Sequence, residues 1–229
     1  MNCTTEHSDS SRREVTSRPF TRAKSLRMRL LPFAAATFGL VSHAHAVCYV
    51  DAGAAGLGNG TSWTDAYIFL PFALINPACT EIWVAKGVYK PTLGTNRAVS
   101  FEISPGTAVY GGFAGGETMR ESRAPTRNVT VLSGDIDNND LQTAGNGVDA
   151  TDHDIVGNNS YHVVTMTGSP ATPISASTIL DGFTITGGKA DGALDSSGGA
   201  FYCSAVGIGS TCNPTIANVS FVGNTGRDG

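Results

Sequence analysis

The chain has 229 residues, of which 15% are charged, 41% are hydrophobic and 28 are glycine. This composition excludes long disordered tails, and the glycines have no three-residue period, which excludes a collagen-like structure. The formal net charge of −4 argues against nucleic-acid binding, and no apolar run reaches the ~18 residues that a membrane-spanning helix needs.

The first 46 residues differ in charge from the rest of the chain. They carry seven Arg or Lys and three Asp or Glu, and an apolar stretch at residues 30–41 precedes Ala44-His45-Ala46. A basic segment, a short apolar segment and an A-x-A pattern are typical of a secretory signal peptide. We therefore expect residues 1–46 to be a signal peptide cleaved after Ala46, with Met1 or Met28 as the true start. A short core helix is the alternative.

Without this leader the domain is more acidic. Residues 47–229 keep eight basic and 16 acidic side chains, which is a net charge of −8 over 183 residues. Such a domain is not attracted to anionic membranes or to nucleic acids. We expect a secreted, extracellular or outer-membrane-associated protein with no nucleic-acid partner and no transmembrane segment in the mature chain.

Four cysteines remain after the leader, namely Cys48, Cys79, Cys203 and Cys212. An even number of cysteines in an exported chain favours disulfides, and no C-x-x-C spacing indicates zinc. Three pairings are possible. We favour Cys48–Cys79 and Cys203–Cys212, because each pair closes a local loop.

Residues 47–98 are expected to form an N-terminal cap region. A short strand at 48–52 and a glycine-rich loop precede the one clear helix candidate, residues 66–75, which has N-cap chemistry at 62–65. Pro71 must kink or shorten this helix. Residues 81–89 are typical of a strand, a turn and a second strand. A strand and an amphipathic helix in this place could cover the open end of a sheet.

From residue 99 onward, short apolar alternations are interrupted by Gly, Asn and Asp. Each alternation has three to five residues, which is short for a β-sandwich and typical of stacked coils. The candidate strands are 99–103, 108–110, 129–132, 162–166, 178–180, 182–186, 215–217 and 219–222.

Internal similarity favours a solenoid. Residues 180–188 align with 216–224 at an offset of 36, and residues 164–168 align with 183–187 at an offset of 19. With a coil of roughly 18–20 residues, these offsets correspond to two coils and one coil. The alignment predicts an all-β parallel β-helix at 99–229, with Gly and Asn at its corners. Chance matching of Thr/Gly/Ile-rich segments is the alternative.

Two short motifs carry a family resemblance. Gly198-Gly199-Ala200-Phe201 and Phe221-Val222-Gly223-Asn224 are similar to the G-G-A-(I/L/V) and F-x-x-N motifs of polymorphic outer-membrane protein repeats. Residues 109–118 and 131–138 resemble the N-terminal region of bacterial exported right-handed parallel β-helix proteins with a pectate-lyase-like fold. The resemblance covers residues 48–229 and implies a right-handed helix. Because further coils and an anchor domain are missing, we expect a fragment whose coils are C-terminally incomplete.

A cluster of oxygen-bearing side chains is the best candidate for a metal site. Its members, Asp135, Asp137, Asn139 and Asp140, begin like a calcium-binding EF-hand loop, and oxygen ligands in a turn suit calcium. The pattern then fails, because Asp140 replaces the usual glycine and Asn146 the usual glutamate. A second acidic patch at 149–154, with Asp149, Asp152 and Asp154, could complete the site. An acidic solvated turn is the alternative.

No catalytic constellation is recognisable in the sequence. The resemblance implies enzymes that act on acidic polysaccharides, and Asp181, Asp191 and Asp195 are hydrolase candidates by residue type alone. His162 alternates with apolar strand residues and is expected to be structural. We expect an exported or cell-surface β-helix protein, adhesin-like or structural, that binds polysaccharide or cell-surface ligands. A polysaccharide lyase or glycoside hydrolase of the pectate-lyase-like fold is the alternative.

Overall fold

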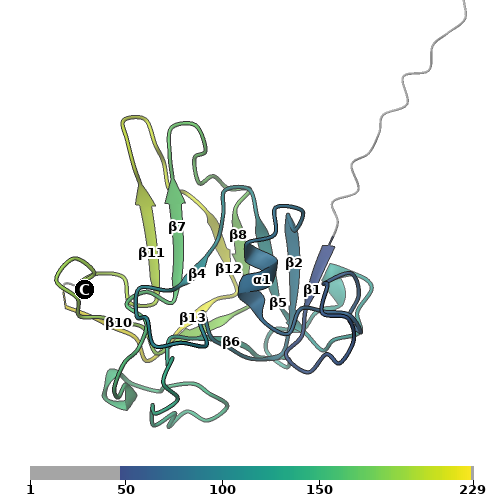
Figure 1. Cartoon of the computed structure of the whole chain (residues 1–229), viewed down its shortest axis with the longest axis horizontal. Coiled ribbons are helices and arrows are strands. Elements are labelled where there is room, and N and C mark those ends of the chain that lie inside the picture. Colours follow the sequence, from purple (N-terminus) through teal and green to yellow (C-terminus); the bar gives the residue numbers. More distant parts are fainter. Residues whose placement is uncertain (1–46, 228–229) are drawn as a thin grey trace, which may run out of the picture. The chain divides into compact units, whose positions relative to one another are not determined.

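The computed structural model describes residues 47–227, and the expected signal peptide lies outside the described residues. The described part is nearly all β (Figure 1). It also contains one short α-helix, α1 (Leu70–Leu74), and two 3-10 helices, η1 (Arg120–Ser122) and η2 (Asp152–Asp154). No helix among these residues is long and apolar enough to cross a membrane.

The strands form four sheets in which every pair is parallel. Sheet A contains β1 (Val47–Val50), β2 (Glu81–Ala85), β5 (Ala108–Phe113), β8 (Ile179–Asp181) and β12 (Thr215–Ala217). Sheet B contains β3 (Gly87–Tyr89), β6 (Thr130–Ser133), β9 (Thr184–Thr186) and β13 (Ser220–Phe221). Sheet C contains β4 (Phe101–Glu102), β7 (Val164–Gly168) and β11 (Phe201–Ala205), and β10 (Lys189–Ala190) pairs with β14 (Thr225–Gly226).

From β2 to β11 the chain visits sheets A, B and C in the same order on each coil, which is the arrangement of a parallel β-helix. The predicted fold class is therefore confirmed. The predicted coil length of 18–20 residues is wrong. Ile179 pairs with Thr215, so the offset of 36 is a single coil. The offset of 19 aligns β7 in sheet C with β9 in sheet B, so it does not correspond to a coil. The two segments look alike because strands of every sheet alternate inward and outward residues in the same way.

The corners predicted from the alignment are present. Gly182 and Asn218 occupy equivalent corners between sheets A and B, with φ of 89° and 49°. Gly187 and Gly223 occupy the next corner, with φ of 71° and 54°, and the Gly187 N–H donates to the carbonyl of Gly223 at 2.8 Å. Gly and Asn adopt this left-handed backbone more readily than other residues, so they mark the corners in the sequence.

The core is a set of inward-facing ladders that run from coil to coil. Each member is at most 1% exposed: Ile82, Val109 and Leu180 in sheet A, Leu132 and Ile185 in sheet B, and Phe101 and Val164 in sheet C. Coil length varies because segments are inserted between the strands. After β2, the longest segments between strands follow β5 (residues 114–129) and β6 (residues 134–163).

The N-terminal helix is shorter than the predicted 66–75. It begins at Leu70 with Pro71 in its first turn, and Phe69 provides no side-chain cap. Ser62 and Asp65 close a turn with each other instead, and the Asp65 N–H donates to Ser62 Oγ at 3.0 Å. Proline is tolerated in the first turn of a helix and not within it, which explains the late start.

Both predicted disulfides, Cys48–Cys79 and Cys203–Cys212, are confirmed. The first ties β1 to the segment that follows α1, and the second closes the excursion after β11. Two disulfides are typical of proteins that function outside the reducing cytoplasm. Three short strands, β10, β11 and β14, were not among the predicted ones.

Candidate functional site

An aromatic layer covers the outer face of sheet A. Tyr49, Trp83 and Tyr110 are register neighbours on three successive strands, and Asp181 takes the same position on the next strand. Trp83 stacks on Phe113 with ring centroids 4.7 Å apart. The layer therefore ends at Asp181, where a carboxylate replaces the aromatic ring.

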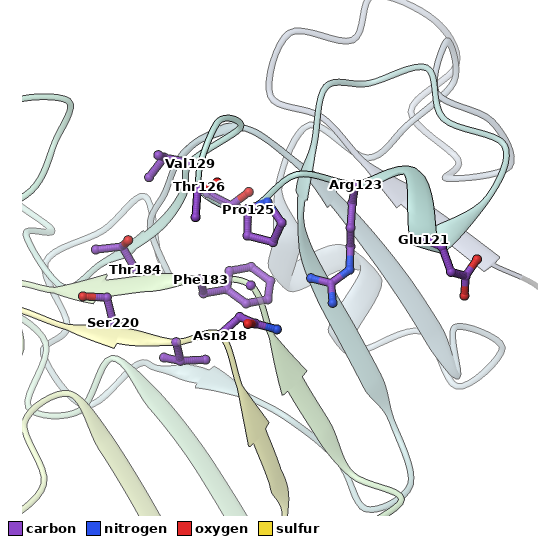
Figure 2. A pocket seen from close by; sticks show the side chains of 12 residues that line it. Glu121, Arg123, Pro125, Thr126, Val129, Phe183, Thr184, Asn218 and Ser220 are labelled. Carbon is purple, nitrogen blue, oxygen red and sulfur yellow. The ribbon is translucent and has the colours of Figure 1, made fainter.

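A groove lies next to Asp181, between the 114–129 segment and the coil corners (Figure 2). Its volume is about 550 Å³. Its lining combines charged, apolar and hydroxyl- or amide-bearing side chains, namely Glu121, Arg123, Pro125, Thr126, Val129, Thr130, Gly182, Phe183, Thr184, Asn218, Val219 and Ser220.

Arg123 is held in a fixed position at the edge of this groove. Its Nη2 donates to Asp181 Oδ2 at 2.5 Å, and its Nη1 donates to the carbonyl of Gly111 at 3.3 Å. The other Asp181 oxygen accepts a hydrogen bond from Asn218 at 2.8 Å. A Cβ at Gly182 would lie 2.8 Å from the carbonyl oxygen of Gly111 and 2.6 Å from Arg123 Nη1, so this corner favours glycine for space as well as for its φ. The groove is thus pre-organised, and its guanidinium is already neutralised.

The apolar surface of the groove comes from Pro125, Val129 and Val219, which are all at least partly exposed. The Phe183 ring borders the groove in Figure 2, but this residue is only 2% exposed and belongs to the core. The exposed hydroxyls of Thr126 and Ser220 also line the groove. An apolar surface beside neutral hydrogen-bonding groups suits a ligand with one apolar face and many hydroxyls. Two carboxylates belong to this arrangement: Glu121 on the lining and Asp181 at the edge, where Arg123 and Asn218 engage Asp181.

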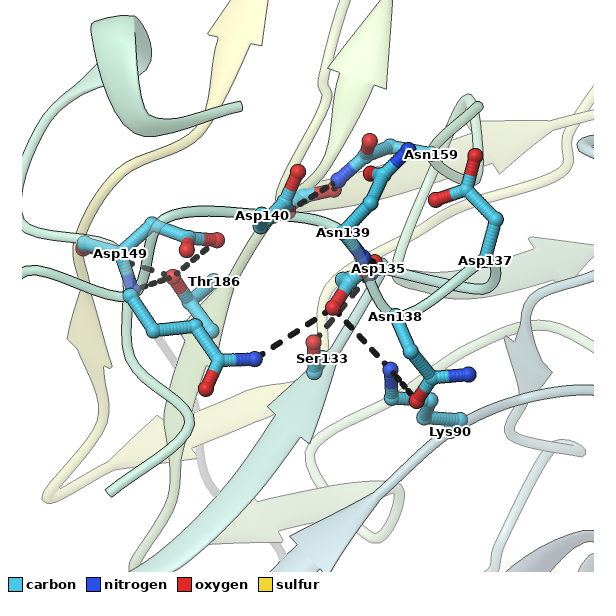
Figure 3. Close-up of polar contacts among 12 residues, drawn as sticks. Lys90, Ser133, Asp135, Asp137, Asn138, Asn139, Asp140, Asp149, Asn159 and Thr186 are labelled. Atoms are coloured by element: carbon cyan, nitrogen blue, oxygen red, sulfur yellow. Dashed lines mark hydrogen bonds and ion pairs between the residues drawn. The ribbon is translucent and has the colours of Figure 1, made fainter. Parts of the chain in front are cut away.

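The 134–163 segment holds a second polar cluster against sheet B (Figure 3). Asp135 is fully buried and accepts from Lys90 Nζ at 3.1 Å and from the Asn139 N–H at 3.1 Å. Lys90 also donates to Asn138 at 2.6 Å. The buried charge of Asp135 is therefore compensated by a basic partner.

Asp140 and Asp149 have no such partner among residues 47–227. Asp140 accepts from the Val156 N–H at 2.7 Å and from Asn159 Nδ2 at 2.6 Å. Thr186 Oγ1 donates to Asp149 at 3.3 Å. Burial, together with the nearby charge of Asp140, raises the pKa of Asp149 to about 7. Burial also raises the pKa of Asp140.

The predicted calcium ligands do not all point to one place. Asp137 accepts from the Asn158 N–H, and Asn139 contributes its backbone to Asp135. Of the second patch, Asp149 joins Asp140, whereas Asp152 is exposed and Asp154 caps η2 through hydrogen bonds to the chain around it. Within residues 47–227, no three His, Cys, Asp or Glu side chains form a group that could hold a metal ion, so calcium binding by Asp135, Asp137, Asn139 and Asp140 stays a prediction.

The three hydrolase candidates have separate partners. Asp181 binds Arg123, Asp191 binds Arg97 at 2.6 Å, and Asp195 lies 3.5 Å from His162 Nε2. His162 also contacts the carbonyl of Gly198 through Nδ1 at 3.1 Å and stacks on Tyr202, as expected for a structural histidine.

No protein-family model, curated protein or solved structure matches this chain. The fold is that of a β-solenoid, and its function has to be argued from the groove and the polar cluster. The groove residues were not singled out from the sequence. One available signal was the alignment of Asn218 with Gly182, which placed a polar side chain at a corner.

Proposed function

We propose that the chain is an exported β-helix module, adhesin-like or structural, that binds a neutral polysaccharide or cell-surface glycan in the groove between Arg123 and Ser220. The observation that carries this proposal is a groove that combines partly exposed apolar side chains, the Arg123–Asp181 ion pair and a row of hydroxyl and amide groups. Sugars offer one apolar face and many hydroxyls, which this lining complements.

The charges of the groove favour a neutral glycan over an acidic one. Arg123 is paired with Asp181, and Glu121 adds an acidic group to the lining. No unpaired cation is therefore left in this lining for a uronate, and the mature domain has a net charge of −8. Like charges repel, so an acidic polysaccharide would bind less well than a neutral one of equal length.

An exported location has two kinds of support. Both disulfides fit an oxidising compartment, and the first 46 residues carry the signal-peptide pattern. The resemblance to bacterial exported β-helix proteins and to polymorphic outer-membrane repeats points to the cell surface. A module of this kind needs a binding groove and does not need catalysis.

A groove-filling variant tests the proposal. Calorimetric titration with neutral oligosaccharides (cello-, xylo- and manno-oligomers) and with oligogalacturonate should give binding to at least one neutral oligomer and weaker binding to the acidic one. Ser220→Tyr, which places a ring in the groove, should abolish this binding. Thr167→Tyr, at an exposed hydroxyl on sheet C, is the matched control and should bind like the wild type.

Three results would contradict this function. Two of them are unchanged glycan binding by Ser220→Tyr and no binding to any oligomer by the wild type. The other is turnover of a glycan, followed by reducing ends or by unsaturated products, which would favour the lyase or hydrolase alternative.

A further inference from the structure

Two basic side chains of the domain have no partner within the described residues. Residues 47–227 contain eight Lys or Arg. Six of them contact an acidic side chain or a backbone carbonyl, namely Lys90, Arg97, Arg120, Arg123, Lys189 and Arg227. The other two, Lys86 and Arg127, form no ion pair and no side-chain hydrogen bond with any residue of 47–227. Because the mature domain has a net charge of −8, an unpaired basic side chain is the exception in it.

Both of these side chains line the same hollow beside β3 and β6. The hollow has a volume of about 390 Å³, and the rest of its lining is one glycine, one asparagine and three valines. No carboxylate of residues 47–227 lines it. Two of the valines, Val88 and Val129, are each 39% exposed. The Gly87 N–H donates to the carbonyl of Val129 at 3.1 Å. This bond holds the segment of Lys86 against that of Arg127, so both positive charges border one space.

The hollow is a direct neighbour of the glycan groove, because Val129 lines both. In the register of sheet B, the corner residues Lys86, Val129 and Gly182 follow one another on three successive coils. Neighbouring strands lie ~4.8 Å apart, so the corner at Lys86 is roughly 10 Å from the corner at Gly182. A glycan in the groove can therefore reach the hollow by crossing one exposed valine.

We propose that Lys86 and Arg127 bind an anionic substituent, a sulfate ester or a carboxylate, of the glycan that lies in the neighbouring groove. A guanidinium presents paired N–H donors that match the oxygens of either group, and an ammonium adds a second positive charge. Exposed valine surface beside these charges suits the sugar ring that carries the substituent. This inference rests on the proposed function, because it takes the ligand to be the same glycan.

A glycan with one anionic substituent differs from a uniformly acidic chain. In the groove itself, Arg123 is engaged by Asp181, and Glu121 adds a negative charge, so neutral sugars fit there. A negative charge is favourable only at the hollow, which is one step further along the corners. Oligogalacturonate carries a carboxylate on every residue and places most of them against the acidic groove. It should therefore stay a weaker ligand than a neutral chain with a single anionic group.

Inorganic anions test the hollow without a glycan. Sulfate and acetate should each shift the NMR signals of the backbone amides at residues 86–88 and 127–129 of the wild type. Lys86→Gln and Arg127→Gln should each lose most of these shifts. Arg227→Gln is the matched control, since Arg227 is an exposed basic residue that does not line the hollow. If neither anion shifts these amides, or if the shifts persist in both hollow variants, the anion site is overturned.

Calorimetric titration then tests the glycan as the source of the anion. The ligands are a xylo-oligomer with and without one glucuronate branch, and a cello-oligomer with and without one sulfate ester. At low ionic strength, at least one substituted oligomer should bind the wild type about tenfold more tightly than its unsubstituted parent. Lys86→Gln and Arg127→Gln should remove this gain and leave the affinity for the parent unchanged. Arg227→Gln should keep the gain.

The outcomes separate this inference from the proposed function. Equal affinity for substituted and unsubstituted oligomers would overturn the inference and leave the neutral-glycan function standing. If no oligomer binds while sulfate still shifts the amides, the proposed function fails, and with it the glycan as the ligand of the hollow. A gain with the sulfated oligomer alone assigns the hollow to a sulfate ester, and a gain with the glucuronate branch alone assigns it to a carboxylate.

Discussion

The early and late coils place similar residues at equivalent inward positions, but they bury them differently. In the sheet A ladder, Ile82 and Leu180 are fully buried, whereas Ile216, the register partner of Leu180, is 37% exposed. In the sheet B ladder, Ile185 is fully buried and its partner Phe221 is 48% exposed. An inward position is therefore not the same as burial.

The difference teaches where the stability of a solenoid lies. An inward side chain loses contact with water only when a neighbour covers each side of its coil. At the N-terminal side, β1 and α1 provide this cover, with Leu70 and Ala73 buried. The early coils also carry the aromatic layer outside sheet A. We therefore expect perturbations of the early and middle coils to cost more free energy of unfolding than equivalent changes in the last coil.

Of the predicted differences in stability, the largest losses are expected when the disulfides are removed. Cys48 and Cys79 are separated by 31 residues, and Cys203 and Cys212 by nine. A cross-link stabilises mainly by restricting the unfolded chain, more so for a longer loop. Replacing Cys48 and Cys79 together by alanine should lower the free energy of unfolding by about 3.5 kcal/mol, and replacing Cys203 and Cys212 by about 2.5 kcal/mol. Urea denaturation of the two double variants measures both values. A larger loss at the C-terminal pair would contradict the comparison.

The next prediction compares the cost of truncating two register partners, one in a covered coil and one in the last coil. Leu180→Ala leaves a cavity between covered coils and should cost about 3 kcal/mol, whereas Ile216→Ala in the last coil should cost about 1 kcal/mol, since Ile216 is already partly in water. Both values come from the shift of the urea midpoint at constant m. Equal losses would show that the last coil is as well covered as the middle one.

The sequence predicted which strand positions are equivalent, but it predicted neither the length nor the path of a coil. The offset of 36 paired Leu180 with Ile216 and Ile185 with Phe221, and these are register partners in the structure. The short distance along the chain within each pair was enough to predict both disulfides. The sheet to which a strand belongs was not predictable, because alternation is the same in all sheets and inserted segments such as 134–163 change the coil length.

The two sites needed the three-dimensional structure for a different reason. The groove joins Arg123 from a loop with Gly182 and Asn218 from two coils, and no local pattern connects these three. In the acidic segment, spacing made Asp149 and Asp152 equivalent candidates. Contact with Thr186 buries Asp149, whereas Asp152 stays exposed. Chain spacing reports the side-chain types in a loop, and it does not report which of them face the sheet.

The smallest predicted change in stability concerns Glu117, whose loop lies beside the outer aromatic layer. The carbonyl of Glu117 accepts from Trp63 Nε1 at 2.8 Å, and its carboxylate accepts the N–H groups of Ala114, Gly115 and Gly116. Burial acts to raise the pKa of Glu117, but these N–H groups outweigh it and lower the pKa below its ordinary value. The ionised form is therefore favoured in the folded state, and its stabilisation is present above the unfolded pKa and lost as pH falls through the folded one.

Glu117→Gln should consequently lower the free energy of unfolding by about 1 kcal/mol at pH 7 and by less as the pH falls toward 3. Tryptophan fluorescence during urea unfolding measures this difference, since Trp63 contacts the same loop. Glu102→Gln, an exposed glutamate on β4, should show no loss at either pH. If Glu117→Gln lowered the free energy of unfolding as much at pH 3 as at pH 7, the ionised carboxylate would not be what holds the 114–117 loop. The aromatic layer outside sheet A would then be held in place there by the packing of Trp63 against Tyr49 and Phe113.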